Sequence, residues 1–169
     1  DDFPVSSGAA GRVFKTRKGF YMEIERKFLV TDLPFPLEQF PFHVIEQAYL
    51  CTEPVIRVRR EDDTYYLTYK GKGMMVREEY NLPLTEESYL HLRAKADGNI
   101  ITKTRYLIPL ADGLTAELDA FQSPNQGLLL AEVEFSSEEQ ALSFTPPDWF
   151  GEDVTRDYHY QNSYMSRMA

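Results

Sequence analysis

The sequence predicts an α+β fold that consists mainly of antiparallel β-sheet. Segments in which apolar and polar residues alternate recur along the chain, and such alternation is typical of strands. The connections between several of these segments are short and contain Gly, Asp, Asn or Pro. An even number of strands with short antiparallel connections favours a meander that could close into a barrel.

Eight strands are predicted, with turn residues between several of them. In chain order they cover residues 22–30, 43–51, 54–61, 64–71, 75–82, 100–109, 113–121 and 128–136. Apolar and β-branched residues indicate the first strand. Asp62-Asp63 separates the third from the fourth, residues 71–73 the fourth from the fifth, and residues 111–113 the sixth from the seventh. The eighth strand follows residues 123–127, which contain Pro and Gly.

Three helical segments are predicted outside the strands. Residues 85–96 begin with Thr85, a capping residue, continue with acidic residues and end near Gly98. Residues 136–142 have the pattern of a short capped helix. A last helix is expected over about residues 158–168.

Residues 1–21 differ in composition from the rest of the chain. They are rich in Ser, Gly and Ala, then basic, and they contain no sustained apolar segment of the kind that a secretory signal needs. Met22 is the first residue of the first predicted strand, where a natural start would lie. We therefore expect residues 1–21 to be a flexible extension or an expression remnant, and residues 22–169 to form a single domain.

Composition excludes several classes of partner. The formal net charge of −9 argues against a surface that binds nucleic acid or anionic lipid. No apolar run is long enough to span a bilayer. Cys51 is the single cysteine, so no internal disulfide is expected and a reducing compartment, the cytoplasm, is favoured. A small-molecule partner is left as the expectation.

Charged residues share one face in nearly every predicted strand, at a spacing of two. Glu23, Glu25 and Lys27 point the same way in the first strand, because strand side chains alternate between two faces. Later strands carry the pairs Arg57/Arg59, Arg77/Glu79, Lys103/Arg105, Glu117/Asp119 and Glu132/Glu134. Carboxylates beside an ammonium can hold a hard cation together with an anion, which is the chemistry of metal-bound phosphate.

Two interpretations of these faces are open from the residues alone. One is an antiparallel sheet with its polar face in water. The other is a sheet curled so that the charged face lines an interior. Burying an unpaired ion costs several kcal/mol, so such a lining needs water, metal ions and a polyanion as partners for its charges. The separation of cationic pairs from anionic pairs on different strands fits the second interpretation better.

A series of short motifs resembles the CYTH superfamily, the triphosphate tunnel metalloenzymes. Residues 23–27 resemble the family's Glu-x-Glu-x-Lys signature. Further matching segments follow in order at residues 47–50, 57–59, 67–71, 77–79, 103–106, 117–121, 132–134, 154–155 and 160–162. The resemblance covers essentially all of residues 22–166, and the compact length is similar to that of small bacterial inorganic tripolyphosphatases.

The resemblance implies an eight-stranded antiparallel β-barrel that closes into a tunnel, with peripheral helices and a C-terminal helix near one mouth. It implies a substrate-binding set that grips phosphate oxygens: Lys27, Arg57, Arg59, Lys70, Arg77, Lys103 and Arg105. Of these, Lys27, Arg57, Arg59, Lys70 and Arg105 are the expected catalytic residues, together with Glu79. Asn81 departs from the pattern, because relatives often have a further acid there.

The resemblance also implies a metal site for Mg²⁺ or Mn²⁺. Its expected ligands, directly or through water, are Glu23, Glu25, Asp119, Glu132 and Glu134, with Glu117 as an additional candidate. A metal ion would neutralise part of the charge on a bound triphosphate.

The expected function is metal-dependent hydrolysis of inorganic tripolyphosphate by water attack on a terminal phosphorus. A second metal ion, Glu79 or Glu134 would activate the water, and the sequence leaves this choice open. Other activities stay open as well: cyclisation of ATP, hydrolysis of thiamine triphosphate, or binding of polyphosphate without catalysis. A homodimer is also left open.

Overall fold

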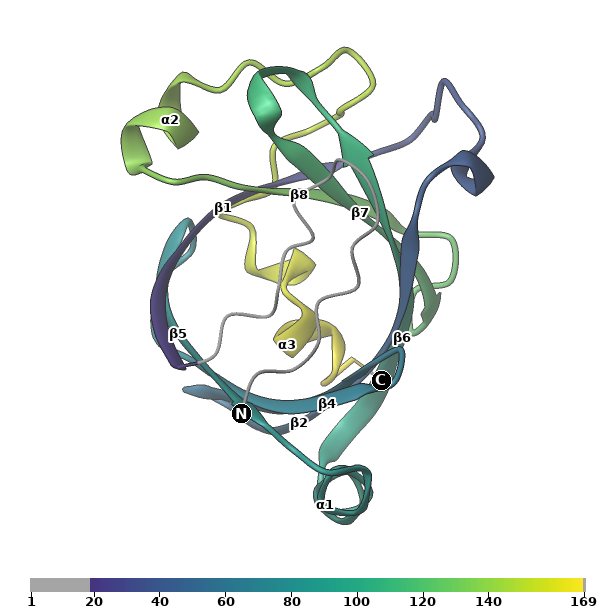
Figure 1. Cartoon of the computed structure of the whole chain (residues 1–169), viewed down its shortest axis with the longest axis vertical. Coiled ribbons are helices and arrows are strands. Elements are labelled where there is room, and N and C mark those ends of the chain that lie inside the picture. The colour runs from purple at the N-terminus through teal and green to yellow at the C-terminus, as the bar shows by residue number, and fades with distance from the viewer. Residues whose placement is uncertain (1–18, 169) are drawn as a thin grey trace.

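The computed structural model describes residues 19–168, and eight strands in this part of the chain close into one barrel (Figure 1). The strands are β1 (Gly19–Leu29), β2 (Phe42–Thr52), β3 (Val55–Glu61), β4 (Thr64–Lys70), β5 (Val76–Pro83), β6 (Asp97–Pro109), β7 (Thr115–Ser123) and β8 (Leu129–Glu134). Their order around the barrel is β1-β5-β4-β3-β2-β6-β7-β8, and every neighbouring pair is antiparallel. The predicted closed, eight-stranded antiparallel barrel is confirmed.

The first strand begins earlier than the sequence predicts. β1 starts at Gly19 rather than at residue 22, because residues 19–21 pair with Asn81, Tyr80 and Glu79 of β5. These three residues therefore belong to the barrel wall and not to an extension. The rest of the predicted extension, residues 1–18, lies outside the described residues.

The helices are short and lie outside the barrel or at one end of it. They are α1 (Glu86–Arg93), α2 (Glu138–Ser143) and α3 (Asn162–Met165), together with single turns η1 (Leu37–Gln39), η2 (Ala111–Gly113) and η3 (Tyr158–Tyr160). Within the described part of the chain, none of them is long and apolar enough to cross a membrane.

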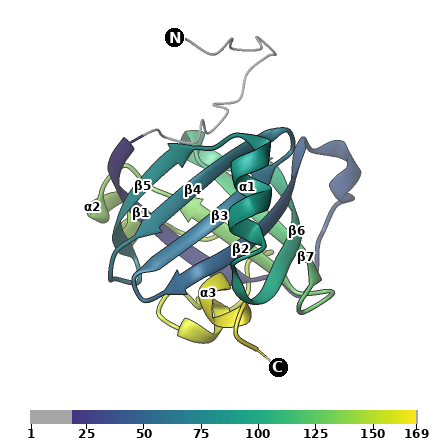
Figure 2. The same cartoon turned by 90° about the horizontal axis from the view of Figure 1, so that it is seen from below.

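Helix α1 covers the outer face of β2, β3 and β4 (Figure 2). The hydroxyl of Thr85 accepts a hydrogen bond from the backbone N–H of Ser88, and the hydroxyl of Ser88 accepts one from the backbone N–H of Thr85. The predicted capping is therefore present. Tyr89 of this helix is buried against Ala48 and Val58 of the barrel. The apolar face of these strands is therefore turned outward, toward the helix.

The predicted C-terminal helix over residues 158–168 is wrong as one continuous element. The chain forms η3, takes an extended conformation at Gln161, and then forms α3. The break turns the Asn162 side chain into the barrel, where its Oδ1 accepts hydrogen bonds from Gln47 and Lys103, each at 3.0 Å. Helix α3 lies across one end of the barrel (Figure 2), as expected for a C-terminal helix near one mouth.

Most of the apolar core lies outside the barrel wall. Phe28, Leu118 and Val133 point outward from β1, β7 and β8 and pack with Ala141 of α2 and with Phe150. A separate apolar cluster fills part of the interior next to α3; it contains Tyr49, Val55, Ile101, Phe121, Leu130 and Met165. Because the outward faces carry the core, the inward faces are left for charged residues. This decides between the two interpretations of the charged pairs: they line the interior.

Candidate active site

The interior of the barrel holds a cavity that is lined by side chains from all eight strands and from the segment that begins α3. The lining includes the seven predicted phosphate-binding cations, Lys27, Arg57, Arg59, Lys70, Arg77, Lys103 and Arg105. It also includes the carboxylates Glu23, Glu25, Glu61, Glu79, Glu117, Glu132 and Glu134. The structure thus brings together every predicted site residue except Asp119, which lies behind the lining.

Arg57 is a buried cation without a counter-ion. It projects inward from β3, and its side chain is only 8% exposed. Its Nε is buried and has no hydrogen-bond partner, and no ion pair of Arg57 is found within residues 19–168. A charged group in this condition is costly to bury unless a ligand supplies the missing partner. Arg57 therefore indicates a site for an anion.

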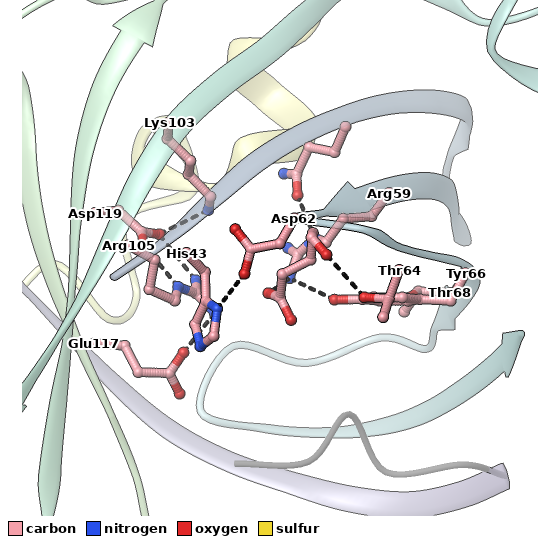
Figure 3. A network of polar contacts seen from close by, with 12 residues as sticks. His43, Arg59, Asp62, Thr64, Tyr66, Thr68, Lys103, Arg105, Glu117 and Asp119 are labelled. Carbon is pink, nitrogen blue, oxygen red and sulfur yellow. Dashed lines mark hydrogen bonds and ion pairs between the residues drawn. The ribbon is translucent and has the colours of Figure 1, made fainter. Parts of the chain in front are cut away.

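Arg59, two residues further along β3, is held by neutral groups. Its Nε donates to Oε1 of Gln47 at 2.8 Å, and its Nη1 donates to the hydroxyl of Tyr66 at 3.2 Å (Figure 3). The nearest carboxylate oxygen, on Glu61, is 4.0 Å away. These contacts orient the guanidinium while leaving most of its charge uncompensated. A planar guanidinium held in this way can grip phosphate oxygens through parallel hydrogen bonds.

Lys103 and Arg105 form a compact ionic cluster around Asp119 (Figure 3). Lys103 Nζ donates to Oδ2 of Asp119 at 2.7 Å, and Arg105 donates to both carboxylate oxygens at 2.7 and 2.9 Å. Arg105 also pairs with Glu117 at 2.5 Å and with Glu132 at 3.3 Å. Burial alone would raise the pKa of Asp119, but Arg105 and Lys103 hold this pKa below its usual range.

Asp119 is not placed with the other four predicted metal ligands. Its side chain is completely buried, and both of its oxygens already accept hydrogen bonds from cations. The cross-strand register explains this position, because Arg105 of β6 lies directly opposite Asp119 of β7. In this arrangement Asp119 orients two cations of the lining.

Lys70 lies between two carboxylates. Its Nζ is 2.9 Å from Oε1 of Glu23 and 3.2 Å from Oε1 of Glu79. Burial would raise the pKa of Glu79, yet Lys70 and Arg57 together hold that pKa well below its usual range. Glu79 is therefore an ionised counter-ion in this structure, with little capacity to accept a further proton.

The carboxylates of β1 and β8 crowd one another. Glu25 stands opposite Glu134 in the register of these strands, and Lys27 stands opposite Glu132. Burial raises the pKa of Glu25 well above its usual value, and the nearby Glu132 and Glu23 raise it further. A divalent cation relieves such repulsion, and hard cations such as Mg²⁺ and Mn²⁺ prefer oxygen ligands. The donor chemistry therefore fits a divalent metal ion.

The same carboxylates are not yet gathered around a common point. Within residues 19–168, no group of three or more acidic, His or Cys side chains is already arranged to hold a metal ion. Two of the carboxylates are instead paired with basic side chains: Lys70 pairs with Glu23, and Lys27 lies 3.5 Å from Glu132. A metal ion would have to take the place of these ammonium groups.

Three residues of the site were missed by the sequence prediction. Gln47 and Asn162 lie in segments that match the family pattern, but no role was assigned to them; they position Arg59 and Lys103. Tyr21, whose hydroxyl donates to Glu79, was placed in the extension. The spacing of two from Tyr21 to Glu23 was the signal that could have placed it on the inner face of the first strand.

The barrel is closed and antiparallel, and its interior combines uncompensated guanidinium groups with crowded carboxylates. These features are typical of one class of protein, tunnel proteins that bind a polyanion together with a divalent cation. Residues 22–139, more than half of the chain, match the CYTH domain. The chain belongs to the CYTH domain family, as the sequence predicted.

Two curated relatives are similar over most of their length. The inorganic triphosphatase of Nitrosomonas europaea is 39% identical over 147 residues, which cover 85% of this chain and 96% of the relative. The inorganic triphosphatase of Acetivibrio thermocellus is 34% identical over 145 residues, which cover 83% of this chain and 90% of the relative.

Solved structures agree with the fold. A crystal structure of an inorganic triphosphatase superposes with a TM-score of 0.66 at 36% identity, covering 87% of this chain and 95% of that one. A putative adenylate cyclase from Bacillus halodurans superposes with a TM-score of 0.57 at 18% identity, covering 73% and 86%. At that identity the second likeness shows the fold alone.

Proposed function

We propose that this chain is a metal-dependent hydrolase of inorganic tripolyphosphate. The observation that carries the proposal is Arg57, a cation that is buried in the tunnel and lacks a partner among residues 19–168. The similarity to proteins named inorganic triphosphatase supports the same substrate class. A linear polyphosphate supplies the several negative charges that such a lining needs.

The lining favours bare polyphosphate over an organic triphosphate. More than half of the residues around the cavity are charged, and both signs occur on neighbouring strands. A nucleoside or thiamine moiety would place an apolar ring among these groups and would strip them of water at a cost. We therefore prefer tripolyphosphate to ATP or thiamine triphosphate as the substrate.

In the proposed reaction, Arg57 and Arg59 hold phosphate oxygens, and Lys27, Lys70 and Arg105 neutralise the remaining charge. A water oxygen bonds to the terminal phosphorus while the bond from that phosphorus to the bridging oxygen breaks, so that orthophosphate and pyrophosphate form.

The proton of the attacking water needs an acceptor. Glu79 does not suit this role in the present arrangement, because its carboxylate forms an ion pair with Lys70 and accepts hydrogen bonds from Tyr21 and Asn81. Glu134, which lines the cavity near the carboxylates of β1, is the base that we propose.

The metal ion, Mg²⁺ or Mn²⁺, would be held by Glu23, Glu25 and Glu132, which leaves Glu134 for the proton of the water, and when bound it would neutralise charge on the phosphate oxygens. We propose that Asp119 takes no part in this set and instead fixes Lys103 and Arg105.

A substrate panel tests the proposal. Purified protein is incubated with tripolyphosphate, pyrophosphate, ATP or thiamine triphosphate, with Mg²⁺, Mn²⁺, Ca²⁺ or a chelator, and phosphate release is measured. We expect release from tripolyphosphate that exceeds the other substrates by about tenfold or more, and its loss in chelator. Cyclic AMP formation, hydrolysis that persists in chelator, or saturable binding without turnover under every metal would each contradict the proposal.

Lys103 gives the reaction an expected pH dependence. Burial lowers the pKa of Lys103 from 10.5 to about 8, and the neighbouring Asp119 only partly offsets this effect. A lysine is charged below its pKa, so the tunnel loses one cation as the pH rises through about 8. We expect kcat/KM for tripolyphosphate to fall by up to about tenfold per pH unit above that point.

The matched variant is Lys103→Arg, because an arginine stays charged throughout this range. Its kcat/KM profile should lack the alkaline decline, while ionisation of tripolyphosphate itself affects both proteins equally. A thermal melt checks that the variant is folded. An alkaline decline of the same midpoint in both proteins would exclude Lys103 as its source.

A further inference from the structure

Tyr21 lies at the end of the tunnel wall opposite α3. It is the first residue of β1 whose side chain lines the cavity, and it stands directly opposite Glu79 of β5 in the register of the two strands. The match to the CYTH domain begins at residue 22, so Tyr21 lies outside the matched residues. Its contact with the tunnel comes from the part of β1 that precedes the matched residues.

The Tyr21 hydroxyl completes the coordination of a buried carboxylate. Glu79 is 4% exposed, and its Oε2 accepts hydrogen bonds from Tyr21 and from the side-chain amide of Asn81, the latter at 2.9 Å. The hydroxyl of Thr68 donates to Oδ1 of Asn81 at 2.6 Å, which keeps the amide N–H group of Asn81 turned toward Glu79. The other carboxylate oxygen of Glu79, Oε1, forms an ion pair with Lys70.

This coordination decides where the Lys70 ammonium can lie. Lys70 has two carboxylate partners, Glu23 and Glu79, and Glu23 is in the proposed metal set. When Glu23 turns to a metal ion, Glu79 is the partner that remains for Lys70. A Glu79 carboxylate that is fixed by two neutral donors holds Lys70 at the wall without the strong attraction of an unsatisfied carboxylate.

We propose that Tyr21 is a positioning residue for the tripolyphosphate site. Its hydroxyl fixes Glu79, and Glu79 in turn keeps Lys70 at the place where the ammonium meets phosphate. This inference rests on the proposed function for the identity of the anion.

Loss of the hydroxyl has a defined consequence. In Tyr21→Phe, Oε2 of Glu79 loses one of its two donors in a buried position, which leaves a charged acceptor undersatisfied. Lys70 and Arg57, the two cations that lower the pKa of Glu79, are then drawn toward the Glu79 carboxylate. Both become less available to phosphate, so anion binding weakens while the residues that carry out the chemical step are unchanged.

The test is binding of tripolyphosphate to the full chain in chelator, measured by calorimetry, together with steady-state kinetics in Mg²⁺. For Tyr21→Phe we expect the dissociation constant and KM to rise roughly tenfold, with kcat changed by less than about threefold. The matched control is Tyr80→Phe, because Tyr80 is exposed on the outer face of β5, next to Glu79 in sequence. It should bind and turn over tripolyphosphate as the unaltered protein does.

A double-mutant cycle separates positioning through Lys70 from a general structural effect. In a Lys70→Met background, Tyr21→Phe should cause a smaller loss of metal-free tripolyphosphate binding than it does in the unaltered protein, because only Arg57 is left to respond. An equal loss in both backgrounds, or a dissociation constant of Tyr21→Phe within about twofold of the unaltered protein, would overturn the role of Tyr21. Binding without hydrolysis by the unaltered protein would instead overturn the proposed function and leave the binding test of Tyr21 valid.

Discussion

Replacing Arg57 by Ala should lower kcat/KM for tripolyphosphate by about a hundredfold or more, because it removes a bidentate donor from a buried site. The same change should leave the fold intact. Arg57 is 8% exposed and its Nε has no partner among the described residues, so its removal breaks no hydrogen bond or ion pair in this part of the chain. We therefore expect the melting temperature of Arg57→Ala to be equal to that of the unaltered protein or higher.

Two further variants sharpen the Arg57 experiment. Arg57→Lys keeps the charge but loses the planar fork, so it should recover only part of the activity. Arg60→Ala is the matched control, because Arg60 is an exposed residue of the same strand, β3, and donates to the backbone oxygen of Asp62. It should retain normal kcat/KM. Near-normal turnover by folded Arg57→Ala would refute the assignment of the tunnel as the site of hydrolysis.

The expected combination of lost activity and retained stability reflects how the tunnel distributes its charges. Among residues 19–168 Arg57 has no ion pair, and Arg59 is held mainly by the neutral side chains of Gln47 and Tyr66, with the Glu61 carboxylate 4.0 Å away. Lys103 and Arg105, in contrast, are compensated by Asp119. Cations of the first kind are available to an anionic ligand, and they lower the stability of the empty protein. Cations of the second kind also line the tunnel, but Asp119 offsets part of their charge, so their removal costs stability as well as anion binding.

The inner face of the barrel could be predicted from sequence because strand side chains alternate with a period of two. That rule places Glu23, Glu25 and Lys27 on one face without any knowledge of the tertiary structure. It does not reveal which residues face each other across strands. The register of β6 and β7 puts Arg105 opposite Asp119, and both oxygens of the Asp119 carboxylate are then taken by hydrogen bonds from Arg105 and Lys103.

Two other differences between the predicted and the observed structure have similar causes. The pattern of residues 158–168 is compatible with one helix, but the chain is extended at Gln161 because Asn162 forms hydrogen bonds inside the barrel. Such a tertiary contact overrides local propensity and leaves no local signal. The start of β1 at Gly19 was missed because Met22 was taken as a boundary, although the alternation continues back to Tyr21.

Replacing Asp119 by Asn should destabilise the protein strongly. Asp119 is completely buried and accepts hydrogen bonds from Lys103, which is itself 1% exposed, and from Arg105. Asparagine has nearly the same shape but no charge and only one accepting oxygen, so Lys103 and Arg105 lose their shared counter-ion. Leaving a buried charge without its counter-ion costs about 3–5 kcal/mol, which corresponds to a drop in melting temperature of about 10 °C or more.

The measurement is thermal and urea unfolding in chelator, with Glu25→Gln as the matched comparison. Glu25 is crowded by Glu132 and Glu23, so removing its charge should leave the stability of the metal-free protein unchanged or raise it. In chelator, removing the charge of a metal ligand should therefore leave the stability unchanged or raise it, whereas removing the charge of a structural counter-ion should lower it. If Asp119→Asn unfolds like Glu25→Gln in chelator and differs from the unaltered protein only when Mg²⁺ or Mn²⁺ is added, Asp119 is a metal ligand after all. If it is already destabilised in chelator, its carboxylate acts on Lys103 and Arg105, and its loss should weaken tripolyphosphate binding through those two cations.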